Sequence, residues 1–176
     1  TLTPEQSADL GRVFDAVVAS NLAQPRVFVH RDYMPRNLMV SEPNPGILDF
    51  QDAVYGPITY DVASLFKDAF ISWPEPRVID WTVRYWEQAK RAGLPVDPDF
   101  GAFYRDFEWM GLQRHLKVLG IFARLKHRDG KDGYVEDTPR FVAYVRAVAA
   151  RYNGLGPLLR LFDALEGAAP RTGYTF

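Results

Sequence analysis

Cysteine is absent from the 176-residue sequence, and so are long hydrophobic runs. Without cysteine the chain forms neither disulfide bonds nor thiolate metal sites, which is compatible with a cytoplasmic location. The longest fully apolar run, from Val118 to Ala123, has about six residues, whereas a membrane-spanning helix needs about 18 or more. Because the first residues also lack the pattern of a signal peptide, we expect a cytoplasmic protein with no membrane partner.

An excess of charge of one sign is also missing. The chain carries 21 Lys and Arg against 22 Asp and Glu, and its pI is near 6.3, so it lacks the basic footprint of nucleic-acid binding. Hydrophobic residues make up 47% of the chain, which excludes a disordered protein. Residues 1–100 carry 9 Lys and Arg against 14 Asp and Glu, whereas residues 101–176 carry 12 against 8. We expect the acidic and the basic half to face different substrate groups or partners.

The hydrophobic spacing predicts a mainly helical chain with a small antiparallel β-hairpin region, an α+β fold. Thr3 and Gln6 form a capping-box pattern with Pro4 at the first helical position, and Val13, Phe14, Val17 and Val18 follow on one helical face. Short apolar runs come next, at residues 27–29, 38–40 and 47–48. A turn rich in Pro, Asn and Gly separates the last two runs, which should therefore pair as an antiparallel hairpin.

The rest of the chain is predicted to be helical. An apolar stripe from Val62 to Phe70 indicates a helix that stops before Pro74. The next helix is expected to turn Ile79, Val83 and Trp86 inward. It belongs to a set of helices over residues 76–93, 99–126, 139–152 and 157–165.

The segment from His30 to Asn37 matches H-R-D-x-x-x-x-N, the catalytic-loop pattern of kinases. Phosphoryl transfer needs a carboxylate that orients the attacking hydroxyl and accepts its proton, and oxygen ligands that hold Mg²⁺ on the phosphates. Asp32 suits the first task and Asn37 the second, and another carboxylate follows at Asp49.

The predicted hairpin supplies a geometric test of this interpretation. Asn37 immediately precedes the first strand of the hairpin, and Asp49 follows the second. Because the start of one strand lies beside the end of the other in an antiparallel pair, we expect both side chains at the open end of the hairpin, as two ligands of one Mg²⁺.

Other interpretations of these residues are available. His30 and Asp32 could form a metal pair, but no third ligand has suitable spacing. Asp32 and Asn37 could also be ordinary turn formers. We expect His30 to orient the loop through hydrogen bonds. Asp52 could be a second metal ligand or a solvated turn residue, and Asp61 could cap a helix or brace the catalytic loop through backbone N–H groups.

The segments HRDYMPRN and LDFQDAVYGPITYD resemble the C-terminal lobe of the aminoglycoside phosphotransferase family, which has a protein-kinase-like fold. The similarity continues through FYRDFEWMGLQRHLKVLGIFARL and RDGKDGY, so that it covers roughly residues 5 to 152. This longer run is similar to the branch of bacterial anomeric kinases of N-acetylmuramate and N-acetylglucosamine, which act in cell-wall recycling. The resemblance implies an ATP- and Mg²⁺-dependent kinase that phosphorylates a hydroxyl of a small molecule.

The resemblance also implies roles for single residues. Asp32 would be the catalytic base, Asn37 and Asp49 the Mg²⁺ ligands, and Asp61 the buried carboxylate that braces the catalytic loop. Only eleven residues separate Asp49 from Asp61, which leaves no room for the phosphorylatable activation segment of protein kinases.

The N-terminal lobe of that family, with its phosphate-covering loop and ATP-anchoring lysine, has no counterpart in the sequence. The Gly-containing loop 130–133 follows no strand and does not match a phosphate loop. We therefore expect residues 1–166 to form the catalytic and acceptor-binding lobe of a longer polypeptide and residues 167–176 to form a tail. We expect this lobe to have little or no kinase activity by itself.

The acceptor is expected to be an amino sugar. In the family that the chain resembles, helices of the C-terminal lobe build most of the acceptor pocket, and here they fall mostly in the basic half, which disfavours polycationic aminoglycosides. Candidate contacts are Arg114, His115, Arg124 and the loop 128–131, although for any one of them a solvated helix face or loop is the more common explanation. An aminoglycoside, choline or homoserine acceptor remains an alternative, as does a non-catalytic, pseudokinase-like module.

Overall fold

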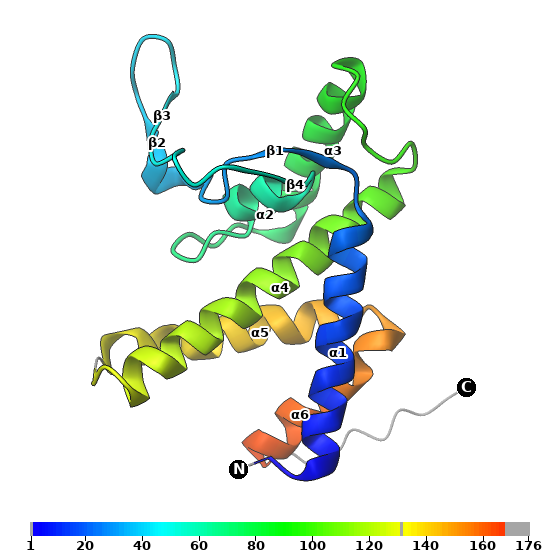
Figure 1. Ribbon diagram of the computed structural model, residues 1–176, viewed down its shortest axis with the longest axis vertical. Helices are drawn as coiled ribbons and strands as arrows, with labels where there is room; N and C mark the ends of the chain where they lie inside the picture. The colour runs from blue at the N-terminus through cyan, green and yellow to red at the C-terminus, as the bar shows by residue number, and fades with distance from the viewer. Residues whose placement is uncertain (1, 131, 168–176) are drawn as a thin grey trace. The chain divides into compact units, whose positions relative to one another are not determined.

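The computed structural model describes residues 2–130 and 132–167 (Figure 1). Positions 168–176 of the expected tail, and Lys131, lie outside the described residues. The chain divides into two compact units, one from Ser20 to Val118 and the other made of the residues before and after this range. The elements follow in the order α1 (Pro4–Ala23), β1 (Arg26–Val29), β2 (Leu38–Met39), β3 (Gly46–Ile47), β4 (Val54–Pro57), α2 (Tyr60–Phe66), α3 (Glu75–Arg91), α4 (Phe100–His127), α5 (Thr138–Ala149) and α6 (Gly156–Glu166). The predicted mainly helical α+β fold is confirmed.

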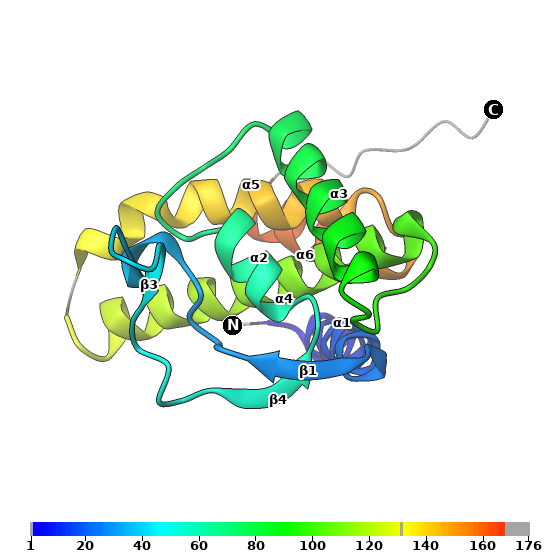
Figure 2. The ribbon, with the colours of Figure 1, turned by 90° about the horizontal axis from the view of Figure 1, so that it is seen from above.

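The unit Ser20–Val118 contains two antiparallel strand pairs. The predicted hairpin is confirmed, with Leu38 of β2 opposite Ile47 of β3. The pairing of β1 with β4, which sets Val29 opposite Val54, was not expected from the sequence. The run Val-Tyr-Gly-Pro of β4 contains Gly and Pro, which weaken any strand signal. Figure 2 shows the two pairs apart from each other, with the connecting segments 30–37 and 48–53 running between them.

Helix α2 is shorter than the apolar stripe predicts. It ends at Phe66, so the prediction that the helix continues to Phe70 is wrong. The reason is Asp68, whose buried carboxylate accepts hydrogen bonds from the backbone N–H groups of Phe70 (2.8 Å) and Ile71 (3.0 Å). This turn offers the backbone an alternative to the helical hydrogen bonds.

The core of this unit joins α2, α3 and the first part of α4. A cluster of buried residues contains Val62, Ala63, Val78, Phe107 and Met110. Helix α3 presents the predicted face only in part. Ile79 is 37% exposed and Val83 and Trp86 are half-buried, whereas the fully buried residues are Val78, Thr82 and Ala89. The buried face is thus rotated by about one residue from the expected face.

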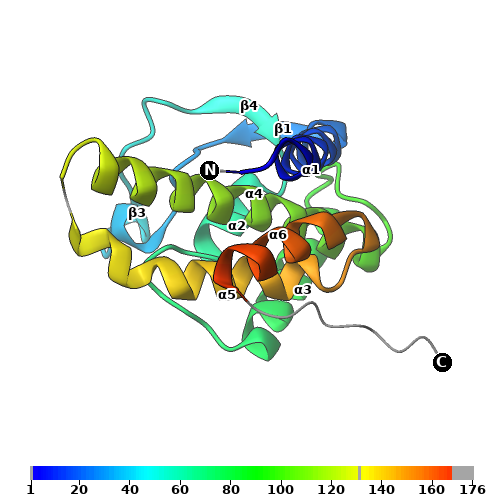
Figure 3. The ribbon, with the colours of Figure 1, turned by 90° about the horizontal axis from the view of Figure 1, so that it is seen from below.

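The other compact unit consists of the first part of α1, the last part of α4, α5 and α6. Figure 3 shows α5 and α6 next to each other, and Arg146 of α5 binds Asp163 (2.7 Å) and Glu166 (2.8 Å) of α6. The predicted capping box of α1 is confirmed, since the N–H group of Gln6 donates to Thr3 Oγ1 (3.2 Å) and that of Thr3 donates to Gln6 Oε1 (2.9 Å).

The predicted apolar face of α1 divides into a buried and an exposed row. Val13 and Val17 are buried, whereas Phe14 and Val18 are 46% and 52% exposed. Within residues 2–130 and 132–167, no helix is both long and apolar enough to cross a bilayer.

Candidate active site

The loop that carries the kinase-like motif begins where β1 ends. Asp32 lies at its centre, and its backbone carbonyl accepts hydrogen bonds from the N–H group of Met34 (3.0 Å) and from Asn37 Nδ2 (2.8 Å). A 3₁₀ turn over Pro35–Asn37 then leads directly into β2. The amide nitrogen of Asn37 therefore helps to fix the shape of the loop, and the amide oxygen takes no part in this bond. In the part of the chain that the structure describes, no group donates a hydrogen bond to the Asp32 carboxylate.

Asp61 of α2 holds the start of this loop. Its two carboxylate oxygens accept hydrogen bonds from the backbone N–H groups of His30 (2.7 Å) and Arg31 (3.0 Å). Arg31 has a positive φ of 78°, a conformation that is strained for a long side chain and that needs such support. Thr59 occupies the N-cap of α2, so the structure places Asp61 as a bridge to the loop instead of as the helix cap.

The surroundings of Asp61 have two opposite effects on its pKa. Burial raises the pKa of Asp61 above its ordinary value, because desolvation disfavours the charged form. The N–H groups of His30 and Arg31 oppose this effect, as does the positive charge of Arg114. The hydrogen bonds therefore offset part of the cost of burying the charged carboxylate.

His30 connects the loop to the segment before Asp49. The His30 side chain is buried, and its Nε2 lies 2.9 Å from the backbone carbonyl oxygen of Leu48. Because a carbonyl oxygen only accepts, Nε2 carries the proton of this bond. The Nε2 atom of His30 thus positions the segment before Asp49, the kind of role that the sequence indicates for this residue.

The hairpin brings Asn37 and Asp49 to the same end. The N–H group of Leu48 donates to the backbone carbonyl of Asn37 (2.9 Å), which continues the β2–β3 ladder by one pair. Asp49 is the next residue and has a φ of 64°, a left-handed conformation that Asp tolerates better than most residues. Its Oδ1 accepts a hydrogen bond from Gln51 Nε2 (2.7 Å).

The oxygen donors at this end fit Mg²⁺. They are the amide of Asn37 and the carboxylate of Asp49, and Mg²⁺ in phosphate-binding sites takes one or two protein ligands and completes its shell with phosphates and water. Asp52 is exposed, and its backbone carbonyl accepts a hydrogen bond from Arg31 Nη1 (3.2 Å). No group of three or more His, Asp or Glu side chains within residues 2–130 and 132–167 could hold a metal by itself.

The three residues predicted to contact an acceptor have different surroundings. Arg114 Nη1 lies 3.4 Å from the backbone carbonyl of Arg31, and its guanidinium stands over the Tyr60 ring at 5.2 Å. His115 is only 3% exposed, so it belongs to the interior. Arg124 is exposed and belongs to the other compact unit. Arg114 thus contacts the motif loop.

A model of the phosphotransferase enzyme family matches residues 2–103. The chain belongs to this family. The resemblance to aminoglycoside phosphotransferases that the motifs indicate is thereby confirmed, and the chain supplies the part of the family fold that contains the motif loop.

Curated relatives add a comparison at higher identity. The chain is 57% identical over 169 residues to a Pseudomonas putida protein named N-acetylmuramate/N-acetylglucosamine kinase, with 96% of this chain and 50% of the relative covered. Proteins of the same name from Neisseria meningitidis serogroup B and Caulobacter vibrioides are 54% and 34% identical, with 99% and 78% of this chain and 53% and 38% of the relatives covered. The chain spans about half the length of the Pseudomonas and Neisseria relatives.

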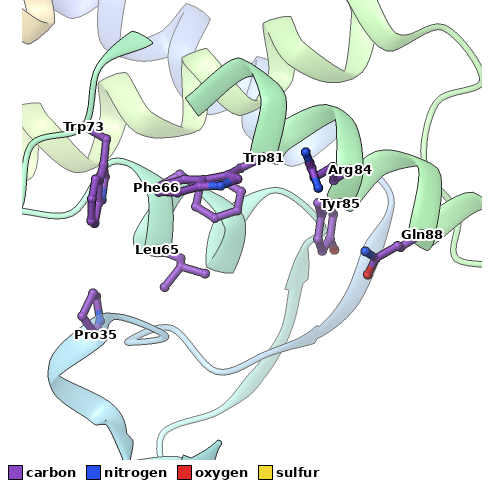
Figure 4. A pocket seen from close by; sticks show the side chains of 8 residues that line it. All are labelled: Pro35, Leu65, Phe66, Trp73, Trp81, Arg84, Tyr85 and Gln88. Carbon is purple, nitrogen blue, oxygen red and sulfur yellow. The ribbon is translucent and has the colours of Figure 1, made fainter. Parts of the chain in front are cut away.

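Sequence reasoning missed an aromatic cavity beside the motif loop of this phosphotransferase family member. The cavity has a volume of about 420 Å³, and Figure 4 shows the side chains around it. It is lined by Pro35, Leu65, Phe66, Trp73, Trp81, Arg84, Tyr85 and Gln88. The density of tryptophan between residues 73 and 86 was the available signal, but spacing alone does not distinguish a cavity wall from a core.

Proposed function

We propose that this chain supplies the catalytic base and the metal-binding oxygens of an ATP-dependent kinase whose acceptor is N-acetylmuramate or N-acetylglucosamine. The observation that supports this most strongly is a pair of hydrogen bonds at the open end of the hairpin. Asn37 Nδ2 donates to the backbone carbonyl of Asp32 (2.8 Å), and the N–H group of Leu48, the residue before Asp49, donates to the backbone carbonyl of Asn37 (2.9 Å). The acceptor is proposed from the relatives, three of which are 54–57% identical and named as kinases of these two sugars.

In the proposed reaction, the Asp32 carboxylate accepts a hydrogen bond from the acceptor hydroxyl and directs it at the γ-phosphorus of ATP. The hydroxyl oxygen forms the new P–O bond, the bond to ADP breaks, and the hydroxyl proton passes to Asp32. Asn37 and Asp49 would hold Mg²⁺, which neutralises charge on the phosphates. Asp61 and His30 keep the loop in place while this happens.

The nucleotide is proposed to be held jointly with a further, N-terminal lobe of the same polypeptide. The relatives are about twice as long as this chain, and the hairpin exposes apolar side chains that a neighbouring lobe would cover. Val40 is 97% exposed, Phe50 62% and Leu48 49%. Residues 1–166 then act as the catalytic and acceptor-binding lobe of a cytoplasmic cell-wall recycling enzyme.

The experiment is a phosphoryl-transfer assay with γ-labelled ATP and the full-length kinase that contains this chain. We expect label on N-acetylmuramate and N-acetylglucosamine, with NMR placing the phosphate on the anomeric oxygen, and little or no transfer by the 176-residue chain alone. Transfer restricted to an aminoglycoside, choline or homoserine would replace the proposed acceptor. Absence of transfer to every acceptor would show a non-catalytic module.

A further inference from the structure

The aromatic cavity lies within the unit Ser20–Val118 and opens beside the motif loop. Its wall includes Pro35, which follows Asp32 by three residues, and it extends along α2 and α3. In Figure 4, Pro35 and Trp73 stand at one end and Arg84 and Gln88 at the other. A volume of about 420 Å³ is within the range of about 300–1,000 Å³ that is typical of small-molecule sites.

Ring systems form the middle of the cavity. Trp81 contacts Phe66 at 5.5 Å between ring centroids and Trp73 at 5.1 Å, the latter with an interplanar angle of 77°. All three side chains are only partly buried, so part of their apolar surface remains open to a ligand. The C–H groups of a pyranose ring match such rigid aromatic surfaces, which provide a large contact area with little loss of conformational freedom.

The polar end of the cavity comes from one face of α3. Arg84 and Gln88 are four residues apart, and both side chains are exposed. Gln88 carries both a donor and an acceptor, the complement of an acetamido group. Arg84 Nε binds Asp80 Oδ2 at 2.9 Å, but these side chains are 69% and 53% exposed. Because exposed ion pairs contribute little to stability, the carboxylate of a ligand can replace Asp80 as the partner of Arg84 at a small cost in free energy.

Further contacts connect the cavity to the catalytic loop. Ser64, next to the lining residue Leu65, has its Oγ 3.5 Å from the backbone carbonyl of Arg31. Burial raises the pKa of Tyr85, and the negative charge of Asp61 adds to this effect. Through Pro35, the cavity therefore adjoins the same loop that carries Asp32.

We infer that this cavity is the acceptor-sugar site, with the sugar ring against Trp73 and Trp81 and with Arg84 pairing with the lactyl carboxylate that N-acetylmuramate has and N-acetylglucosamine lacks. The inference rests on the proposed function for the identity of the sugars. It assigns recognition to α3 and to the segment before it, instead of to the arginines of α4.

The test is sugar binding to the 176-residue chain, measured by ligand-observed NMR, together with KM values in the full-length kinase. Arg84→Gln is expected to weaken N-acetylmuramate binding about tenfold or more, which corresponds to one charge-assisted hydrogen bond. Binding of N-acetylglucosamine is expected to stay within about twofold, because that sugar has no carboxylate. Arg91→Gln, on the same helix but outside the cavity, is the matched control and should leave the binding of both sugars unchanged.

Trp73→Leu should weaken the binding of both sugars, with circular dichroism as the check of folding.

The outcomes separate the inference from the proposed function. If Arg84→Gln raises the KM of both sugars equally, or leaves the KM of N-acetylmuramate unchanged while the kinase turns it over, the role of Arg84 is overturned and the kinase assignment stands. If a folded Trp73→Leu chain binds both sugars normally, the cavity is not their site. If the chain binds both sugars with the expected pattern but no phosphate is transferred, the proposed function fails and the sugar site remains.

Discussion

The motif loop and the aromatic cavity lie side by side but are built in different ways. The loop is held by short hydrogen bonds to backbone groups, among them those of Asp61 to His30 (2.7 Å) and of Leu48 to Asn37 (2.9 Å). The cavity is formed by ring side chains of α2, α3 and the segment between them, and it contains few polar groups. Backbone hydrogen bonds fix a reacting carboxylate within a narrow range of positions, whereas apolar walls select a ligand by its shape.

The largest expected effect comes from the loop side of this comparison. Asp32→Asn removes the proposed proton acceptor and is expected to lower kcat of the full-length kinase by about 10²–10⁴-fold. The KM values for ATP and sugar should stay nearly unchanged, because the amide keeps the volume of the carboxylate. Steady-state kinetics measure kcat and the KM values. The control is Asp15→Asn, a substitution at an exposed position of α1. Normal turnover by the Asp32 variant would reject its role as the base.

Asp61 and Asp68 provide a matched pair for the next effect. Each accepts hydrogen bonds from two successive backbone N–H groups, Asp61 in the loop and Asp68 in the segment that leads to Trp73. Replacing either by Ala should cost about 2–3 kcal/mol of unfolding free energy, measured by urea denaturation of the chain.

The two alanine variants should differ in their kinetics. Asp61→Ala is expected to lower kcat, because the loop that carries Asp32 loses its support, and Asp68→Ala is expected to raise the KM of the sugar. If both variants changed kcat alone, the division of labour between loop and cavity would be wrong.

A smaller effect concerns a contact between the two regions. The guanidinium of Arg36 in the loop stands 3.6 Å from the ring centroid of Phe70, in the segment before Trp73. An exposed cation–π contact is worth about 0.5–1 kcal/mol. Urea denaturation of Arg36→Gln, Phe70→Ala and the double variant should give a coupling energy of this size. A coupling energy of zero would mean that loop and cavity are energetically independent.

The smallest effect is a pH slope. The pKa of Asp61 is raised above 3.8 in the folded chain by burial, so the folded state binds this proton more tightly than the unfolded state does. The contribution of Asp61 to stability is therefore fully present below 3.8 and declines as pH rises through the folded pKa. Urea midpoints of the chain and of Asp61→Asn, compared from acidic to neutral pH, should show the chain losing stability relative to the variant. Parallel curves would contradict the raised pKa.

Several features of the fold and the site could be predicted because their signals are local. The hairpin register follows from the turn at residues 41–46, and this register brings Asn37 next to the residue before Asp49. The motif loop is equally predictable, because the spacing from His30 to Asn37 lies within one short segment. The pairing of β4 with β1 was not predicted, because it joins residues that are far apart in the sequence. The end of α2 was also missed, because hydrogen bonds to the Asp68 side chain replace the helical hydrogen bonds that the apolar stripe predicts.

The sequence by itself determined the chemistry that we propose for this protein, because the candidate base and the two candidate oxygen ligands are set by residue type and by their spacing between Asp32 and Asp49. The tertiary structure alone decided which face of α3 lines the aromatic cavity that we propose for the acceptor. Helix α3 buries Val78 in place of Ile79, a rotation of about one residue that turns Trp81, Arg84 and Gln88 toward the cavity. This choice depends on packing against α2 and α4, and hydrophobic periodicity on a helix with apolar residues on more than one side does not specify it.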